Sequence, residues 1–147
     1  MKKRTKGKDR KGFTLVEIMA VLFIIGLLAA VAVKSFMGQT DKARVITTRA
    51  KLSDLASAVN LFKLNSGRYP DEDMGLEELI EQPADIETWQ SGGYLTTTEV
   101  PKDAWGNDFE FELNTESGKP FVIISYGADG EPGGEEFDAD LYSTDAN

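Results

Sequence analysis

The stretch from Phe13 to Val33 reads FTLVEIMAVLFIIGLLAAVAV and contains a single charged residue, Glu17. Wound as an α-helix, its 21 residues rise about 31 Å, which is enough to cross the roughly 30 Å hydrocarbon core of a bilayer. A lone segment in lipid must satisfy its own backbone hydrogen bonds, and a helix does so. The stretch therefore predicts the transmembrane half of a helix, which we place at residues 13–34.

The residues before this stretch carry much of the positive charge of the chain. Residues 1–12 hold seven Lys or Arg and one acid, Asp9. Basic flanks stay on the cytoplasmic side of a membrane, so the N-terminus is expected there and the rest of the chain on the opposite side. A conventional secretory signal peptide also begins with basic residues and is the alternative. The apolar stretch is longer than an ordinary signal core and runs into a further helical pattern, which favours the anchor.

Composition excludes several classes of function. From Phe13 onward the chain holds 9 Lys or Arg against 24 Asp or Glu, and such an acidic body repels nucleic acid. The sequence has no Cys and no His, which excludes disulfides, thiolate catalysis and imidazole bases. It also has no glycine-rich phosphate loop. We therefore expect a protein that is not an enzyme and does not bind nucleic acid.

Glu17 requires an explanation, because a carboxylate inside a membrane span costs a few kcal/mol unless it has a partner. One explanation is that Glu17 reaches back to the headgroups or stays protonated. The other applies if the chain is cut between Gly12 and Phe13, which gives Phe13 a new α-ammonium. Glu17 of one subunit could then pair with the ammonium of a neighbouring subunit in a filament.

The helical pattern continues beyond the span. Apolar residues recur at helical spacing at Val45, Leu52, Leu55, Val59 and Phe62. Asn65-Ser66-Gly67 is a typical helix stop, and no linker composition separates the two halves. The sequence therefore predicts one long helix whose second half belongs to a globular domain.

Residues beyond Gly67 predict a small α+β domain. Met74 to Ile80 favours a short helix, and residues 109–113 and 121–124 favour two strands of a hairpin. A lone hairpin is marginally stable, so it is expected to pack across the apolar stripe of the helix. Four aromatic side chains are expected to fill the core rather than line a ligand pocket: Tyr69, Trp89, Tyr94 and Trp105.

The tail from Tyr126 to Asp140 is rich in acids and glycine. It is either a solvated acidic tail or a loop that wraps a calcium ion, because Ca²⁺ takes six to eight carboxylate and carbonyl oxygens. The EF-hand spacing is absent, and spacing alone leaves both interpretations open.

Lys11-Gly12-Phe13-Thr14-Leu15-Val16-Glu17, followed by the apolar run, resembles the class III signal of type IV pilins and type II secretion pseudopilins. The resemblance implies cleavage after Gly12 by a prepilin peptidase, N-methylation of Phe13, and a role for Glu17 in assembly. These proteins usually have a proline near the end of the span, where this chain has Lys34. An interfacial anchor is the simpler role for Lys34.

An ordered set of motifs resembles the major pseudopilin family of type II secretion systems. The motifs are Arg68-Tyr69-Pro70, Gly75-Leu76-Glu77-Glu78-Leu79, Gly92-Gly93-Tyr94-Leu95, Pro101-Lys102-Asp103-Ala104-Trp105-Gly106-Asn107 and Gly127-Ala128-Asp129-Gly130. Family members commonly have proline where Ala104 stands. The resemblance implies a type IV pilin-like fold with a periplasmic domain over residues 35–147. It also implies a homopolymeric pseudopilus that helps export folded proteins.

The same resemblance implies partners and a structural calcium ion. Expected partners are other copies of the chain, minor pseudopilins, the prepilin peptidase, the inner-membrane assembly platform and membrane lipid. Asp129 and Asp140 are the first candidate ligands for calcium, followed by Asp138 and the Tyr126 carbonyl. Two alternatives remain: a type IV or competence pilin, and a membrane-tethered hydrolase that uses carboxylates. The second would need acids that converge in an apolar cleft.

Overall fold

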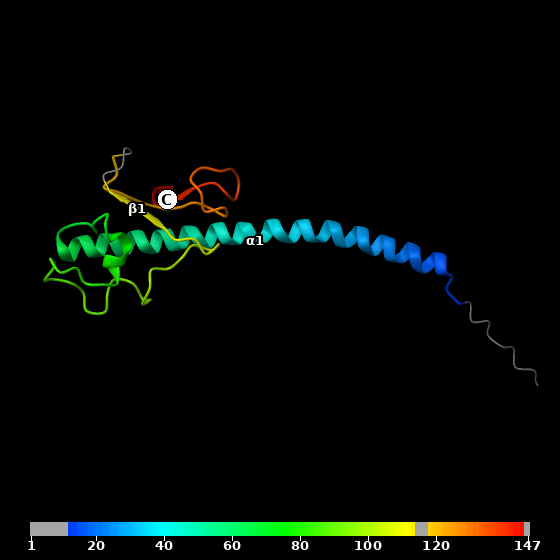
Figure 1. Ribbon diagram of the computed structural model, residues 1–147, viewed down its shortest axis with the longest axis horizontal. Coiled ribbons are helices and arrows are strands. Elements are labelled where there is room, and N and C mark those ends of the chain that lie inside the picture. The colour runs from blue at the N-terminus through cyan, green and yellow to red at the C-terminus, as the bar shows by residue number, and fades with distance from the viewer. Residues whose placement is uncertain (1–11, 114–117, 146–147) are drawn as a thin grey trace, which may run out of the picture. The chain divides into compact units, whose positions relative to one another are not determined.

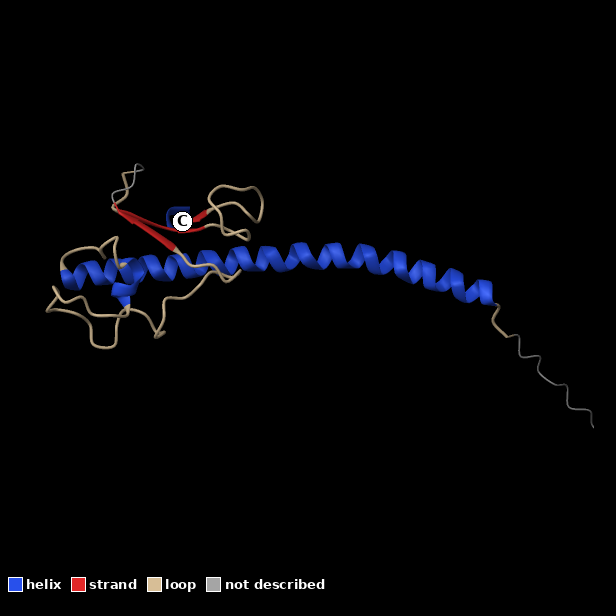
Figure 2. Cartoon of the chain, viewed as in Figure 1, coloured by secondary structure: helices blue, strands red, loops and turns tan. Residues whose placement is uncertain are grey.

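The computed structural model describes residues 12–113 and 118–145, although the side chains of residues 31–37 are not described. The predicted leader, apart from Gly12, lies outside these ranges. The chain divides into two units with the boundary between Gln39 and Thr40. The elements along the chain (Figures 1 and 2) are α1 (Leu15–Ser66), η1 (Gly75–Leu79), β1 (Glu110–Leu113), β2 (Phe121–Ser125), β3 (Leu141–Tyr142) and η2 (Ser143–Asp145).

Thr14 determines where α1 begins. The backbone N–H of Glu17 donates to Thr14 Oγ1 at 3.2 Å and to the Thr14 carbonyl at 3.1 Å. A threonine that accepts from the third helical N–H is an N-cap, and Thr-x-x-Glu is the spacing of a capping box. The helix therefore starts at Leu15, two residues later than the predicted span, and Phe13 precedes it.

The other end of α1 agrees with the predicted stop. The helix ends at Ser66, and Gly67 follows with φ 83°, which a residue without a side chain adopts readily. The Gly67 N–H donates to the Lys63 carbonyl at 2.9 Å, and Ser66 Oγ donates to the Phe62 carbonyl at 2.8 Å. These bonds satisfy carbonyls of the last turn that would otherwise have no intrahelical partner.

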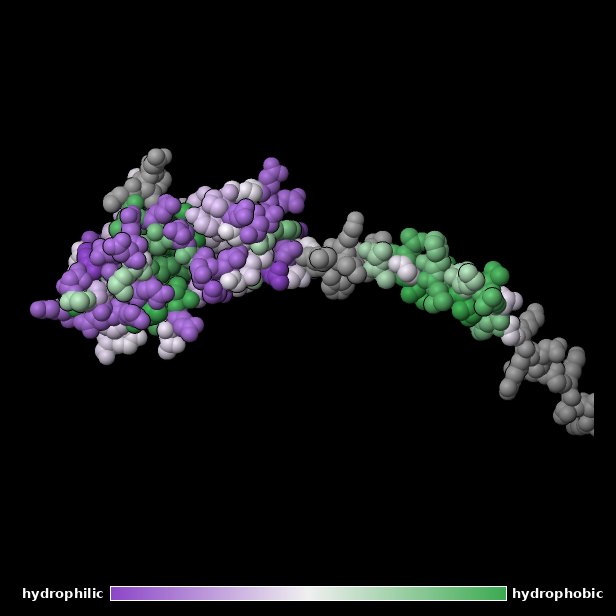
Figure 3. Space-filling view, in the orientation of Figure 1, coloured by the Kyte–Doolittle hydropathy of each residue, from purple (hydrophilic) through white to green (hydrophobic). Residues whose placement is uncertain are grey.

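The first unit exposes apolar side chains. Every residue from Gly12 to Ala30 is exposed, including Phe13 and Leu15 at 78% each and Leu28 at 65%. Figure 3 shows this part of the chain as an almost continuous hydrophobic surface. In the described residues, no helix has the length and hydropathy that a membrane crossing requires. The transmembrane assignment of residues 13–34 extends into 31–37, whose side chains are not described, and stays a prediction.

The second unit has a core between α1 and the sheet. Leu52, Leu55, Val59 and Phe62 of α1 are at most 1% exposed and belong to one cluster with apolar residues of η1, β1 and β2. The predicted packing of the hairpin on the helical stripe is confirmed. Of the four aromatic residues expected there, Tyr94 is buried, and Tyr69, Trp89 and Trp105 pack against the cluster.

The sheet has the order β1-β2-β3 and is antiparallel throughout. The predicted hairpin is confirmed, with Glu110 opposite Ile124 and Leu113 opposite Phe121. The third strand, β3, was not predicted: Tyr142 pairs with Ile124 and Leu141 with Ser125. The segment after the acidic loop is therefore part of the sheet, and the loop connects two paired strands.

Candidate functional sites

The N-terminal site comprises the predicted cleavage point and Glu17. Gly12 and Phe13 have no regular secondary structure, and Phe13 is exposed. Glu17 lies in the first helical turn, where the positive end of the helix dipole favours a carboxylate. Within the described chain, its carboxylate makes no ion pair or hydrogen bond. The site thus presents an exposed peptide bond outside the helix, and a carboxylate four residues after Phe13 that has no partner within the described residues.

A buried carboxylate organises the loop that leads into β1. Asp103 is 4% exposed, and its Oδ1 accepts from the backbone N–H groups of Trp105, Gly106 and Asn107 at 2.9, 2.8 and 2.8 Å. Its Oδ2 accepts from Ser125 Oγ in β2 at 2.8 Å. Four donors on one carboxylate satisfy a buried charge without a cation. Asp103 is therefore a structural centre, although the sequence indicated it only as part of a family motif.

The same loop connects α1 to the C-terminal loop. The Ala104 N–H donates to Thr48 Oγ1 of α1 at 3.1 Å, and Lys51 Nζ donates to the Lys102 carbonyl at 2.6 Å. On the other side, Asn107 Nδ2 donates to the Gly127 carbonyl at 2.9 Å. The segment from Lys102 to Asn107 thus holds the helix and the C-terminal loop together by hydrogen bonds.

A second centre is the guanidinium of Arg68. It bonds to Glu78 Oε2 at 2.7 Å and to Asp85 Oδ1 at 3.1 Å, and the Glu78 side chain is only 2% exposed. The hydrogen bond that Arg68 donates to Glu78, together with the nearby acids, raises the pKa of Arg68 above its ordinary value. The hydrogen bond from Arg68 lowers the pKa of Asp85. No local pattern indicates this cluster, because Glu78 and Asp85 follow Arg68 by 10 and 17 residues.

The predicted calcium residues lie in the loop between β2 and β3. Asp140 accepts from the Gly133 N–H with Oδ1 at 3.0 Å and from the Tyr142 hydroxyl with Oδ2 at 3.0 Å. This second bond raises the pKa of Tyr142. Asp129 Oδ1 accepts from the Glu131 N–H at 3.1 Å, and the Tyr126 carbonyl accepts from Gly130 at 3.2 Å. Each predicted ligand therefore already accepts hydrogen bonds inside the loop, except the exposed Asp138 side chain.

The loop is also tightly folded on itself. A Cβ added at Gly127 would lie 2.7 Å from the Asp138 carbonyl, and one at Gly134 would lie closer still. Both glycines have positive φ. Among the described residues, no three acidic side chains converge as a metal site requires. The oxygen chemistry of Asp129, Asp140 and the Tyr126 carbonyl suits calcium, and the ligand set stays a prediction.

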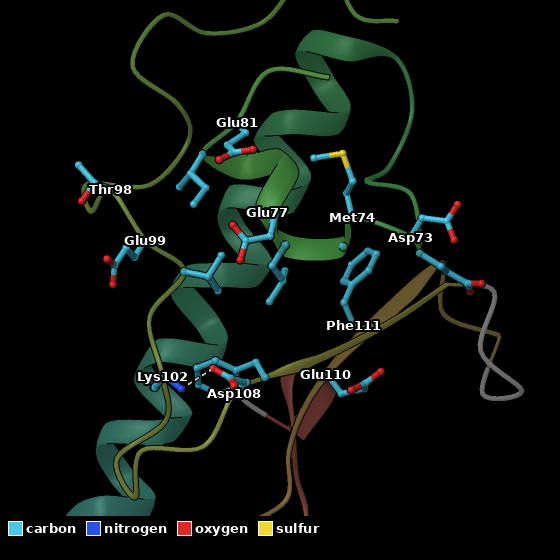
Figure 4. Close-up of a pocket in the computed structure, with 16 residues that line it drawn as sticks. Asp73, Met74, Glu77, Glu81, Thr98, Glu99, Lys102, Asp108, Glu110 and Phe111 are labelled. Atoms are coloured by element: carbon cyan, nitrogen blue, oxygen red, sulfur yellow. Dashed lines mark ion pairs between the residues drawn. The ribbon is translucent and has the colours of Figure 1, made fainter. Parts of the chain in front are cut away.

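An acidic groove of about 510 Å³ lies between η1, β1 and the segment from Thr98 to Lys102 (Figure 4). Its lining includes apolar residues, which we call its floor, namely Met74, Leu76, Ile80, Val100, Phe109 and Phe111, and acids from each bordering segment line the groove as well. The acids that line the groove are Glu72, Asp73, Glu77, Glu81, Glu99, Asp108 and Glu110. No local sequence pattern indicates this groove, because its three borders come from separate segments of the chain.

Comparisons with known proteins identify a family and an N-terminal motif. Residues 35–144 match the family model of type II secretion system protein G, and residues 7–33 match the prokaryotic N-terminal methylation motif. The type II secretion system core protein G of Pseudomonas aeruginosa is 37% identical over 141 residues, which cover 94% of this chain and 97% of that protein. The protein of the same name from Vibrio cholerae is 36% identical and is covered to 92%.

A solved structure is similar as well. The crystal structure of the major pseudopilin from the type 2 secretion system of enterohaemorrhagic Escherichia coli matches with a TM-score of 0.60 and 29% identity. The match covers 72% of this chain and 90% of that one. On sequence, motif and fold together, this chain belongs to the protein G family of type II secretion systems, the major pseudopilins.

Proposed function

We propose that this pseudopilin is cut between Gly12 and Phe13 by a prepilin peptidase, N-methylated at Phe13, and polymerised into a periplasmic pseudopilus that aids export of folded proteins. The observation that carries the proposal is the exposed apolar surface from Phe13 to Leu28. A soluble monomer rarely leaves so large an apolar surface uncovered, so lipid or other subunits must cover it. The structural role requires no catalytic group in this chain.

Membrane anchoring comes before polymerisation in this proposal. Residues 13–34 would span the inner membrane once, with the N-terminus in the cytoplasm and the domain from residue 35 in the periplasm. The basic residues of the leader support this orientation. Partners would be further copies of the chain, minor pseudopilins, the inner-membrane assembly platform and membrane lipid.

Glu17 is proposed to pair with the α-ammonium of Phe13 on a neighbouring copy. Its position in the first turn supports this role, because the carboxylate is exposed and close in sequence to the new N-terminus. In a packed, apolar interface such a pair is strong because little water screens it. The pair would fix the axial register of the subunits.

For the loop from Tyr126 to Asp140 we propose a structural calcium ion, held by Asp129 and Asp140 with the Tyr126 carbonyl and Asp138 as further candidates. Oxygen donors crowded into a glycine-rich loop support the choice of calcium over a metal that prefers nitrogen or sulfur. The resemblance to major pseudopilins supports it as well. A bound ion would stabilise the loop that connects β2 to β3.

The intact mass of the mature chain tests the processing step. When the chain is co-expressed with its peptidase and extracted from membranes, we expect a mass that starts at N-methylated Phe13. Gly12→Ala offers a matched variant that should accumulate as the precursor, because it changes the residue directly before the proposed cut. A mature chain that starts near Ala30 would identify a conventional signal peptide and refute the proposal.

Glu17→Val separates insertion from assembly. Removing the charge makes the span more apolar, so the variant should still insert and still be processed. Filaments should fail to form or should lose their register, while Glu17→Asp should retain part of the function. If Glu17→Val forms normal filaments in cells, the pairing role of Glu17 is wrong.

A further inference from the structure

The acidic groove has more negative charge than the chain itself neutralises. Lys102 borders the groove, but its Nζ is already paired with Asp108 Oδ1 at 2.9 Å. The remaining acids with no ion pair or hydrogen bond of their carboxylates in the described chain are Asp73, Glu77, Glu81, Glu99 and Glu110. In Figure 4, Glu77 and Glu81 lie at the upper centre of the view, and Glu99 lies on the neighbouring segment to their left. A ligand for this groove should therefore be basic.

The floor of the groove adds an apolar requirement. Met74 is 41% exposed, and Ile80 and Val100 are half-buried at the same groove. Like charges around an apolar floor fit a partner that offers cations on both sides of an apolar side chain. A small anion or a purely polar partner would not use both properties.

One surface of the same unit has this chemistry. Lys42, Ile46 and Arg49 follow one another on one face of α1 at spacings of four and three residues, and we call them the basic strip. All three are exposed, and Ile46 is 70% exposed. The strip spans about 10 Å along the helix axis. The strip thus presents one cation on each side of an apolar side chain.

The two cations of the strip are also the Lys and Arg side chains of this unit that have no partner within the described residues. From Thr40 to the end of the described chain, every other Lys or Arg has a partner: Arg44 pairs with Asp41, Lys51 and Lys63 bond to carbonyls, Arg68 bonds to three acids, and Lys102 pairs with Asp108. Lys119 has an interaction as well. Lys42 and Arg49 alone make none in this described part of the unit.

We propose that the acidic groove of one copy receives the basic strip of a second copy, with Ile46 on the apolar floor and Lys42 and Arg49 among the groove acids. The inference rests on the proposed filament, and it deepens that proposal by naming a contact of the globular units. Groove and strip are different surfaces, so the contact is head-to-tail, and such contacts generate open filaments when the rotation does not close a ring. Because exposed charges are screened beyond about 8 Å at physiological salt, the contact should weaken as salt rises.

Engineered cysteines test the contact in the full chain. The natural chain has no Cys, so every disulfide in a variant comes from introduced residues. Arg49→Cys combined with Glu99→Cys should give a ladder of disulfide-linked multimers when membranes with the assembled secretion system are oxidised. Pairs with Glu77→Cys and Glu81→Cys extend the search across the groove. The matched control combines Glu99→Cys with Glu131→Cys, which lies in the C-terminal loop and should give no ladder.

Charge reversal provides a second readout. Reversing the strip (Lys42→Glu, Arg49→Glu) or the groove (Glu77→Lys, Glu81→Lys, Glu99→Lys) should each abolish most of the pelletable polymer. Combining the two should restore most of it. All five side chains are exposed, so circular dichroism should show an intact fold; if a reversed variant unfolds, the cysteine pairs alone decide.

The outcomes separate this inference from the proposed function. A ladder that requires both cysteines, with rescue by the combined reversal, supports the contact. Mature wild-type polymer with no ladder at any groove position, or no effect of reversal, overturns the contact and leaves the pseudopilus role intact. Failure of the wild-type chain to form any polymer overturns both.

Discussion

Replacing Asp103 by alanine removes the acceptor for three backbone N–H groups and for the hydroxyl of Ser125. Leaving a buried donor without a partner costs about 1–3 kcal/mol, and hydrogen bonds to a charged group are stronger than neutral ones. Gly106 is exposed, so water can reach one of the three N–H groups. The net loss should then be about 3–5 kcal/mol, similar to the loss when a buried charge network is broken.

Asn at the same position should cost less. The amide oxygen can accept from the same three N–H groups, and the amide nitrogen can donate to Ser125 Oγ, which reverses that bond. The remaining loss comes from weaker neutral bonds and should be about 1–2 kcal/mol. Asparagine keeps a side-chain oxygen that accepts from the three N–H groups, and alanine does not. The difference between the stability losses of the two variants therefore measures the contribution of these hydrogen bonds.

Urea unfolding of a fragment with residues 35–147, followed by circular dichroism, measures these values. This loss is a large share of a typical total of about 5–15 kcal/mol, so Asp103→Asn, which loses less, keeps the measurement possible if Asp103→Ala does not fold. Asp108→Ala is the matched control: its side chain is 83% exposed, and its pair with Lys102 should contribute under about 1 kcal/mol. A loss below about 1 kcal/mol for Asp103→Ala would refute the role assigned to this carboxylate.

Two further predictions concern the C-terminal loop. If calcium binds only the folded fragment, it adds about 2.7 kcal/mol at a hundredfold excess over Kd, so the fragment should melt several degrees higher in Ca²⁺ than in chelator. Asp129→Ala should abolish this shift and Glu131→Ala should leave most of it; identical melting curves would point to a solvated acidic loop. The pKa of Tyr142 is raised from 10.0, mainly because its hydroxyl donates to Asp140. The contribution of the Tyr142 hydroxyl to folding stability is therefore complete below about pH 10. It is lost as the pH rises through the pKa of Tyr142 in the folded protein. Tyr142→Phe should flatten the alkaline part of the stability profile, and an unchanged profile would contradict this role.

The sequence predicts those elements whose patterns are local. The end of α1 follows from Asn65-Ser66-Gly67, and β1 follows from the alternation of Phe111 with exposed Glu110 and Glu112. The apolar stripe of α1 likewise identified the helical side of the core. In each case the side-chain period or the turn residues determine the structure without help from distant segments.

Other features depend on distant partners and had no local signal. β3 has two residues, too few for a period, and forms because Leu141 and Tyr142 reach the free edge of β2. The role of Asp103 depends on a loop that returns to Ser125 of β2. The acidic groove combines three segments in the same way. The Thr14 cap is different, because its Thr-x-x-Glu spacing was present in the sequence and a search for capping boxes would have found it.

The position of this cap has a consequence for maturation. The hydrogen bond that closes the first turn of α1 lies between Thr14 and Glu17, both downstream of the proposed cut. An N-cap of this kind contributes about 1 kcal/mol to helix stability, and the cut leaves it untouched. Under the proposed processing, the bond between Gly12 and Phe13 lies outside the helix, so a peptidase would not have to unwind α1 to reach it. If the chain is cut after Gly12, the N-cap of α1 lies wholly on the retained side, and the cut adds a positive charge two residues before the helix begins.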